Sequence, residues 1–107
     1  MNYQTITPVE LDERLQRGDE LLLIDVREVD EHAIARIEGA RLLPLSNFHE
    51  WAGTLDPETE IVLMCHHGIR SAQVCAFLAQ QGFTKLSNLA GGIDRWSHEV
   101  DPTVPHY

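Results

Sequence analysis

The sequence contains no long hydrophobic run. Its longest purely apolar stretches are Leu21–Ile24 and Ile61–Cys65, whereas a membrane-spanning helix needs about 20 apolar residues. The first residues also lack the basic stretch and apolar block that mark a secretory signal. We therefore expect no membrane contact and a cytoplasmic location.

Basic residues are scarce. The chain has 8 Lys and Arg against 17 Asp and Glu, which gives a formal net charge of −9. Such a surface repels a phosphate backbone, so we expect no direct nucleic-acid binding. A site for a small anion would have to be built from local donors. That is feasible, because salt screens charges beyond about 8 Å.

Only two cysteines are present, Cys65 and Cys75. Their spacing does not exclude a disulfide, but thiols in the cytosol are kept reduced, so we expect both to be free. Cys75 lies in an apolar, helix-like stretch and is expected to pack in the core. This leaves Cys65 as the candidate for chemistry.

Length and composition are those of an ordinary globular protein. The chain has 107 residues, of which 43% are hydrophobic and 23% are charged. We expect one domain over residues 1–107, with its core at roughly 6–104, and a monomer or weak dimer.

Apolar stretches alternate with helix-like stretches along the chain. A helix should begin after Thr7, with Pro8 at its first position, and end at Gly18. Four more helices are expected: residues 28–33, a helix capped by Ser46, residues 72–81 after Ser71, and a helix that starts at 93–96. The expected strands are residues 21–26, 41–45, 61–64 and 85–89. This order predicts an α/β fold with a parallel sheet and helices on both faces. We expect the tail, residues 101–107, to be extended.

Cys65 follows an apolar strand and precedes a helix, the place where parallel α/β sheets bind ligands. Unpaired N–H groups and the partial positive charge of a helix start favour the thiolate form of a cysteine. Gly68 permits a tight turn whose amides point inward, and Arg70 adds a permanently charged fork for an anion. The pattern predicts a nucleophile at Cys65 beside an anion site that includes Arg70.

The segment Cys65–Arg70 has two alternative interpretations, a buried structural cysteine and a metal site. A lone cysteine at a strand end is more often a buried apolar residue, but two histidines, a glycine and an arginine in the next five positions favour function. Cys65, His66 and His67 are adjacent, and adjacent residues rarely surround a tetrahedral ion, so we expect no metal. His66 and His67 either line the pocket or are solvated loop residues.

Three charged residues follow the first apolar strand. Asp25, Arg27 and Glu28 lie at the same sheet edge as Cys65. We expect an ion-paired network that holds loops together rather than a catalytic group.

The sequence resembles the single-domain rhodanese (sulfurtransferase) family. The resemblance is carried, in family order, by Leu23–Glu28 with Glu31, Gly39–Ala40 before Pro44, Cys65–Ser71, and Gly91–Ile93 with Trp96. It implies a three-layer α/β/α sandwich around a five-stranded parallel sheet. It also implies that Cys65 accepts a sulfane sulfur as a persulfide, while the substrate is held by His66, His67, Gly68, Ile69 and Arg70.

The resemblance further implies the reactants. The donor would be a small sulfur anion such as thiosulfate, and the acceptor cyanide, a thiol or a sulfur-carrier protein, with no cofactor. One departure is Arg36, which stands where family members often have a histidine of largely structural role.

Two other functions stay open as alternatives. Related phosphatases place five residues between cysteine and arginine, whereas four separate Cys65 from Arg70 here, which disfavours a phosphatase or arsenate reductase. A non-catalytic protein-binding module is the other alternative, although such a module would not need either residue.

Overall fold

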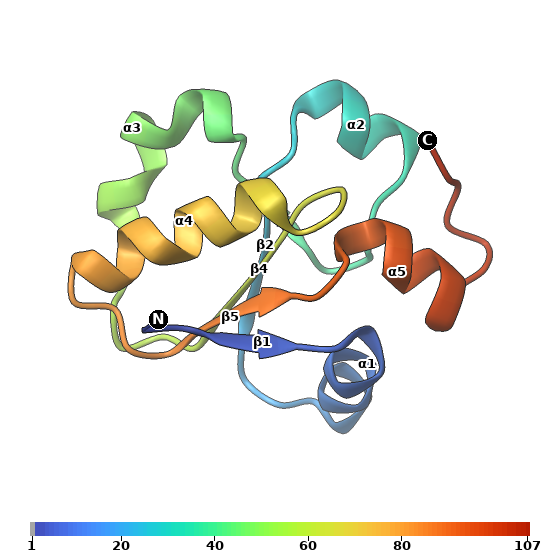
Figure 1. Cartoon of the computed structure of the whole chain (residues 1–107), viewed down its shortest axis with the longest axis horizontal. Coiled ribbons are helices and arrows are strands. Elements are labelled where there is room, and N and C mark those ends of the chain that lie inside the picture. Colours follow the sequence, from blue (N-terminus) through green and yellow to red (C-terminus); the bar gives the residue numbers. More distant parts are fainter. Residues whose placement is uncertain (1) are drawn as a thin grey trace.

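A sheet of five parallel strands forms the centre of the protein (Figure 1). The computed structural model describes residues 2–107. In sequence order the strands are β1 (Gln4–Ile6), β2 (Leu22–Asp25), β3 (Arg41–Leu42), β4 (Ile61–Met64) and β5 (Leu86–Leu89), and in space they lie in the order β1-β5-β4-β2-β3. The predicted α/β/α fold with a five-stranded parallel sheet is therefore confirmed.

Helices cover both faces of this sheet. They are α1 (Pro8–Arg17), α2 (Val29–Ile34), α3 (Phe48–Trp51), α4 (Ile69–Gln80) and α5 (Gly92–Glu99), with short 3-10 turns η1 (Leu45–Asn47) and η2 (Ala52–Thr54). The predicted first helix has its Thr7–Glu10 capping box and ends at Gly18 in a left-handed conformation.

Successive side chains of β4 and of the residue that follows it point into two separate cores. Leu63 and Cys65 pack with residues of α3 and α4, whereas Val62 and Met64 pack with residues of α1 and α5. All four residues of β4 are buried. Burial on both faces explains why the strand is a continuous apolar run instead of an alternating one. It also places Cys65 on the α4 side of the sheet.

Several element boundaries differ from the sequence-based prediction. Strand β1 was not located, because it has three residues and only Ile6 is buried. Strand β3 ends before Pro44, which cannot donate to a ladder. Helix α4 begins at Ile69 and not after Ser71, because Gly68 has φ +102° and forms the N-cap.

The tail is not extended as expected. The Val104 amide donates to the carbonyl of Asp101, and Ser97 Oγ donates to the carbonyl of Val104 at 2.6 Å. Val104 is buried in the α1–α5 core. The turn at 101–104 therefore fixes the tail against α5, and its end lies beside α2 (Figure 1).

No helix within residues 2–107 is both long and apolar enough to cross a bilayer.

Candidate active site

Cys65 stands directly after β4, at the carboxyl edge of the sheet, with its side chain held by the following loop. Its Sγ accepts hydrogen bonds from the Gly68 amide at 3.1 Å and from the Ser71 amide at 3.4 Å. Ser71 Oγ lies 3.3 Å from the same sulfur. Cys65 is 1% exposed, so these donors act in a largely desolvated place. The loop therefore points two backbone amides and one hydroxyl at this sulfur, the kind of donors that bind anions in proteins.

Ser71 and Asn88 form a pair behind the sulfur. Ser71 Oγ lies 2.5 Å from Asn88 Oδ1, and Asn88 Nδ2 donates to the Gly68 carbonyl at 3.1 Å. A hydroxyl has one proton. When the Ser71 hydroxyl donates its proton to Asn88 Oδ1, the Ser71 oxygen can accept a hydrogen bond from a Cys65 thiol. When the hydroxyl rotates, it can donate the same proton to a Cys65 thiolate. The pair therefore suits both protonation states of Cys65.

The sequence alone does not predict this pair. Ser71 is expected there only to open a helix, and Asn88 lies on β5, distant in sequence, with no local signal.

The start of α5 fixes the carbonyl side of the Cys65 loop. The Ile93 amide donates to the Cys65 carbonyl at 2.9 Å, and the Asp94 amide donates to the His66 carbonyl at 3.1 Å. Gly92 has φ +59°, and a Cβ there would lie 2.4 Å from both carbonyl oxygens. Only glycine permits this approach, which gives the Gly91–Gly92 pair a structural reason.

Arg70 forms a bidentate ion pair with Glu31 of α2. The two N–O distances are 2.7 and 2.9 Å. The Arg70 guanidinium lowers the pKa of the Glu31 carboxyl to about 2, and the same pair raises the pKa of Arg70. Five N–H groups are available on a guanidinium, so three remain for another acceptor. In the sequence, only the resemblance to the family pattern points to Glu31.

Tyr107 lies over the loop from the tail. Its ring stacks on His66, with centroids 3.9 Å apart and planes 6° apart, and His66 in turn stacks on His67 at 3.9 Å. Burial raises the pKa of Tyr107 to about 12. Burial lowers the pKa of His66, and the neighbouring His67 lowers it further. The ring of His66 therefore lies between the rings of His67 and Tyr107.

A fully buried ion pair lies beneath the tail. Arg27 donates to both carboxylate oxygens of Asp25 at 2.9 and 2.7 Å, to the Ala35 carbonyl at 2.6 Å and to the Tyr107 hydroxyl at 2.8 Å. The structure thus shows Asp25 and Arg27 in the expected ion-paired role. Glu28 stands apart from this pair and accepts from the amide and hydroxyl of Ser46.

The remaining predicted residues take peripheral places. Ile69 is 72% exposed, and the His67 side chain is also largely exposed. Cys75 is a free, buried thiol whose pKa is raised to about 12 by burial. These features fit a packing role for Cys75 and leave Cys65 as the thiol with polar partners.

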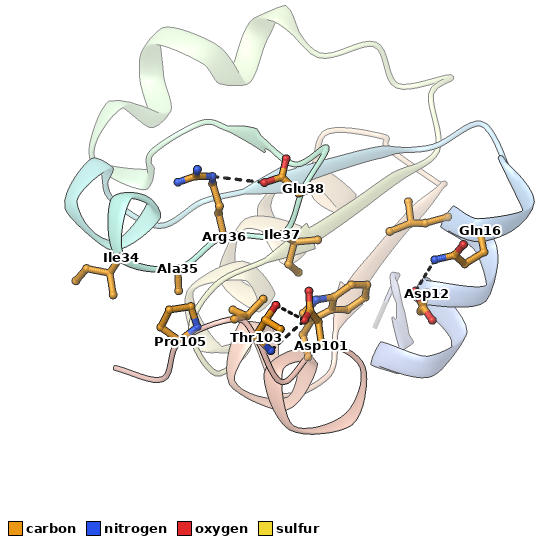
Figure 2. A pocket seen from close by; sticks show the side chains of 13 residues that line it. Asp12, Gln16, Ile34, Ala35, Arg36, Ile37, Glu38, Asp101, Thr103 and Pro105 are labelled. Atoms are coloured by element: carbon orange, nitrogen blue, oxygen red, sulfur yellow. Dashed lines mark hydrogen bonds and ion pairs between the residues drawn. The ribbon is translucent and has the colours of Figure 1, made fainter.

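A pocket of about 620 Å³ lies elsewhere, between α1, the segment 34–38 and the tail (Figure 2). None of the residues 65–71 lines it. Arg36, at the unusual position in the family pattern, is exposed and reaches toward Glu38 at 3.8 Å (Figure 2). The departure at Arg36 therefore does not alter the surroundings of Cys65.

Comparison with known proteins connects this geometry to a family. The family model described as "Rhodanese-like domain" matches residues 7–99. The chain belongs to the rhodanese-like family. The membership predicted from the sequence is thereby confirmed.

Relatives in sequence and solved structures agree with this family membership. The chain is 43% identical over 93 residues to "Rhodanese-like/PpiC domain-containing protein 12, chloroplastic" of Arabidopsis thaliana, covering 83% of this chain but only 31% of that protein. It is 31% identical to "Thiosulfate sulfurtransferase GlpE" of Actinobacillus succinogenes, over 100% of this chain and 96% of that protein. A crystal structure of a rhodanese-related protein from Thermoplasma volcanium superposes with a TM-score of 0.83 at 30% identity, covering 98% of this chain and 100% of that one. The rhodanese-like family to which the chain belongs thus includes enzymes named sulfurtransferases.

Proposed function

We propose that this protein is a sulfurtransferase that moves a sulfane sulfur from a small anionic donor to a thiophilic acceptor through a persulfide on Cys65. The observation that carries the proposal is the set of Gly68 and Ser71 donors around Sγ, at 3.1 to 3.4 Å. These groups can donate hydrogen bonds to a thiolate at this position, and the thiolate is the form of cysteine that acts as a nucleophile. Residues 1–107 are proposed to act as one domain.

The first proposed step loads the enzyme. The Cys65 thiolate attacks the outer sulfur of thiosulfate, a new S–S bond forms, and the original S–S bond breaks as sulfite leaves with the electron pair. Arg70 attracts the dianionic donor with its permanent charge. The first-turn amides of α4, which have no intrahelical acceptor, stabilise the sulfur that stays on Cys65.

The second proposed step transfers the sulfur from Cys65 to the acceptor. Cyanide or a thiolate attacks the terminal sulfur of the persulfide, the S–S bond to Cys65 breaks, and Cys65 returns as a thiolate. Neither step uses a metal or an organic cofactor. His66, His67 and Ile69 lie at the rim of the loop, where they would contact the reactants. An acceptor protein is expected to present basic residues to this acidic chain, in a compartment that keeps thiols reduced, such as the cytoplasm.

Intact-protein mass spectrometry after exposure to thiosulfate tests the proposal. The wild type should gain about 32 Da, the mass of one sulfur, and lose it on addition of cyanide with formation of thiocyanate. Cys65→Ser should show neither change. Cys75→Ser is the matched control and should behave like the wild type, because its thiol is buried and has a raised pKa.

Two results would overturn the proposal. Turnover of an aryl phosphate without any sulfur transfer would indicate a phosphatase, which the four-residue spacing between Cys65 and Arg70 disfavours. An unchanged mass with every donor tried, including thiosulfate and small persulfides, would indicate a binding module.

A further inference from the structure

Three side chains with metal-binding chemistry meet between α5 and the tail. Asp94 and His98 lie four residues apart on α5 and therefore share one helix face, and His106 comes from the tail. Each offers one ligand atom, and these atoms all lie within 4.8 Å of one another. Asp94 Oδ1 is 4.0 Å from His98 Nδ1 and 3.8 Å from His106 Nδ1.

Hydrogen bonds around the cluster orient both imidazoles. Ser97 Oγ donates its proton to the Val104 carbonyl, so toward His106 Nε2 at 3.4 Å it can only accept. The Nδ1 atom of His106 is then the one with the lone pair, and it faces Asp94. His98 Nδ1 lies 2.8 Å from the Asp94 carbonyl, an acceptor, so His98 Nε2 bears the lone pair. Such outer contacts fix the tautomer of metal-binding histidines in general.

The distances are close to those of a metal site. Metal–ligand bonds of about 2.0 to 2.2 Å in a tetrahedron place ligand atoms roughly 3.3 Å apart. Closing the 3.8 Å between Asp94 Oδ1 and His106 Nδ1 is a small movement for the His106 side chain, which is 54% exposed. The His98 side chain is 61% exposed, so solvent leaves room for its ring to turn Nε2 toward the same point. Imidazole and carboxylate ligands together suit Zn²⁺ and similar divalent ions. The net charge of −9 also favours a cation.

A second group, His66, His67 and Asp94, fits a metal less well. His66 is stacked between His67 and Tyr107, with planes 28° and 6° apart. Nitrogen lone pairs lie in the ring plane, so stacked rings direct them side by side instead of toward one point. The rings of His98 and His106 are instead tilted by 42° to each other, so their in-plane lone pairs are not held parallel as in a stack.

We propose that Asp94, His98 and His106 bind one divalent transition-metal ion through the carboxylate and one ring nitrogen of each histidine. Three protein ligands leave a fourth position for water. The ion would connect α5 to the tail next to Tyr107. It would therefore anchor the segment that covers His66, and it would take no part in the chemistry at Cys65.

Zinc titration of the full chain without an affinity tag, in competition with a chromogenic chelator, tests the site. The wild type should bind one Zn²⁺ at this site. His98→Gln and His106→Gln should each weaken binding by at least about tenfold, the lower bound for loss of even an outer contact. His49→Gln, an exposed histidine of α3, and Cys65→Ser should leave the affinity unchanged. Absence of binding, loss of binding in Cys65→Ser, or unchanged binding in both His98→Gln and His106→Gln would overturn the proposal.

Amide hydrogen exchange tests the anchoring of the tail. Zn²⁺ should slow exchange in residues 101–107 of the wild type and of His49→Gln, but not of His98→Gln, which leaves the tail sequence intact. Unchanged exchange in the wild type at saturating Zn²⁺ would show that the ion does not anchor the tail. Because neither readout involves sulfur transfer, failure here would leave the proposed function untouched.

Discussion

The hydroxyl of Tyr107 donates to Glu31 Oε2 at 2.8 Å, and the same oxygen accepts from Arg70 at 2.9 Å. One carboxylate thus connects the tail to the arginine proposed to attract the donor. The Tyr107 ring also stacks on His66, inside the Cys65 loop. The position of the tail and the geometry around Cys65 are therefore linked.

Removal of the Tyr107 side chain should widen access to Cys65. In Tyr107→Ala, the ratio of kcat/KM for a bulky thiol acceptor, such as glutathione, to that for cyanide should rise about tenfold. A tenfold change corresponds to about 1.4 kcal/mol. Steady-state kinetics with the two acceptors at saturating thiosulfate measures the ratio.

Tyr107→Phe is the matched control for access. It keeps the ring on His66 but loses the bonds to Arg27 and Glu31, so its acceptor ratio should lie nearer to the wild type than that of Tyr107→Ala. An unchanged ratio in Tyr107→Ala would mean that the tail does not limit acceptor access.

Arg70 should matter mainly for anionic donors. Arg70→Ala should lower kcat/KM for thiosulfate by about 10- to 100-fold, the equivalent of one charge-assisted hydrogen bond. Arg70→Lys should recover part of this, because lysine keeps the charge but lacks the fork. Arg36→Ala removes an exposed arginine outside the site and should change little. Thiosulfate kinetics of Arg70→Ala equal to the wild type would refute the role of Arg70.

The Glu31–Arg70 pair should make stability depend on pH in the acid range. The folded-state pKa of Glu31, about 2, is below its ordinary value of 4.5, so ionised Glu31 stabilises the fold above pH 4.5. That contribution is lost as the pH falls from about 4.5 toward about 2. Glu31→Gln lacks it at every pH. We expect a difference in unfolding free energy of about 1 to 3 kcal/mol at pH 7, reduced by partial solvent exposure.

Denaturant unfolding of both proteins at a series of pH values measures this difference. The difference in unfolding free energy should shrink steadily below pH 4.5, because protonation of Glu31 weakens its pair with Arg70 in the wild type, whereas Glu31→Gln has no carboxylate to protonate. A difference that stays constant from pH 7 down to pH 3 would contradict the assignment of the shift to Glu31.

Local patterns were enough to predict the elements that position Cys65. The apolar run at 61–64 required burial on both faces, and Gly68 and Arg70 stand within five residues of the cysteine. The capping box at Thr7 likewise lies within one helical turn. In each case the physical cause lies in residues that are neighbours in the sequence, so the structure could be predicted from the sequence.

Partners that meet only through the fold could not be predicted in this way. Asn88 reaches Ser71 because β5 lies beside β4, and Tyr107 reaches Glu31 because the turn at 101–104 reverses the tail. Neither contact leaves a periodic or spacing signal. The expectation of an extended tail was wrong because burial of Val104 fixes a turn at 101–104, and the local sequence does not show that burial.

Substitution of Gly92 should damage the Cys65 loop more than a comparable substitution elsewhere. Gly92 and Gly39 both have positive φ, +59° and +86°, so alanine is strained at either position by about 1 to 2 kcal/mol. Space is open around Gly39, but a Cβ at Gly92 would lie 2.4 Å from the carbonyl oxygens of Cys65 and His66. Overpacking adds about 1 to 3 kcal/mol at Gly92.

We therefore expect Gly92→Ala to lower the free energy of unfolding by about 2 to 5 kcal/mol and Gly39→Ala by about 1 to 2 kcal/mol. Sulfur transfer per folded molecule should fall only in Gly92→Ala, because the carbonyls that it displaces belong to the residues at and next to the nucleophile. Denaturant unfolding together with thiosulfate–cyanide turnover measures both effects. Equal losses in the two variants would show that backbone strain alone matters and that the contact of α5 with the Cys65 loop does not.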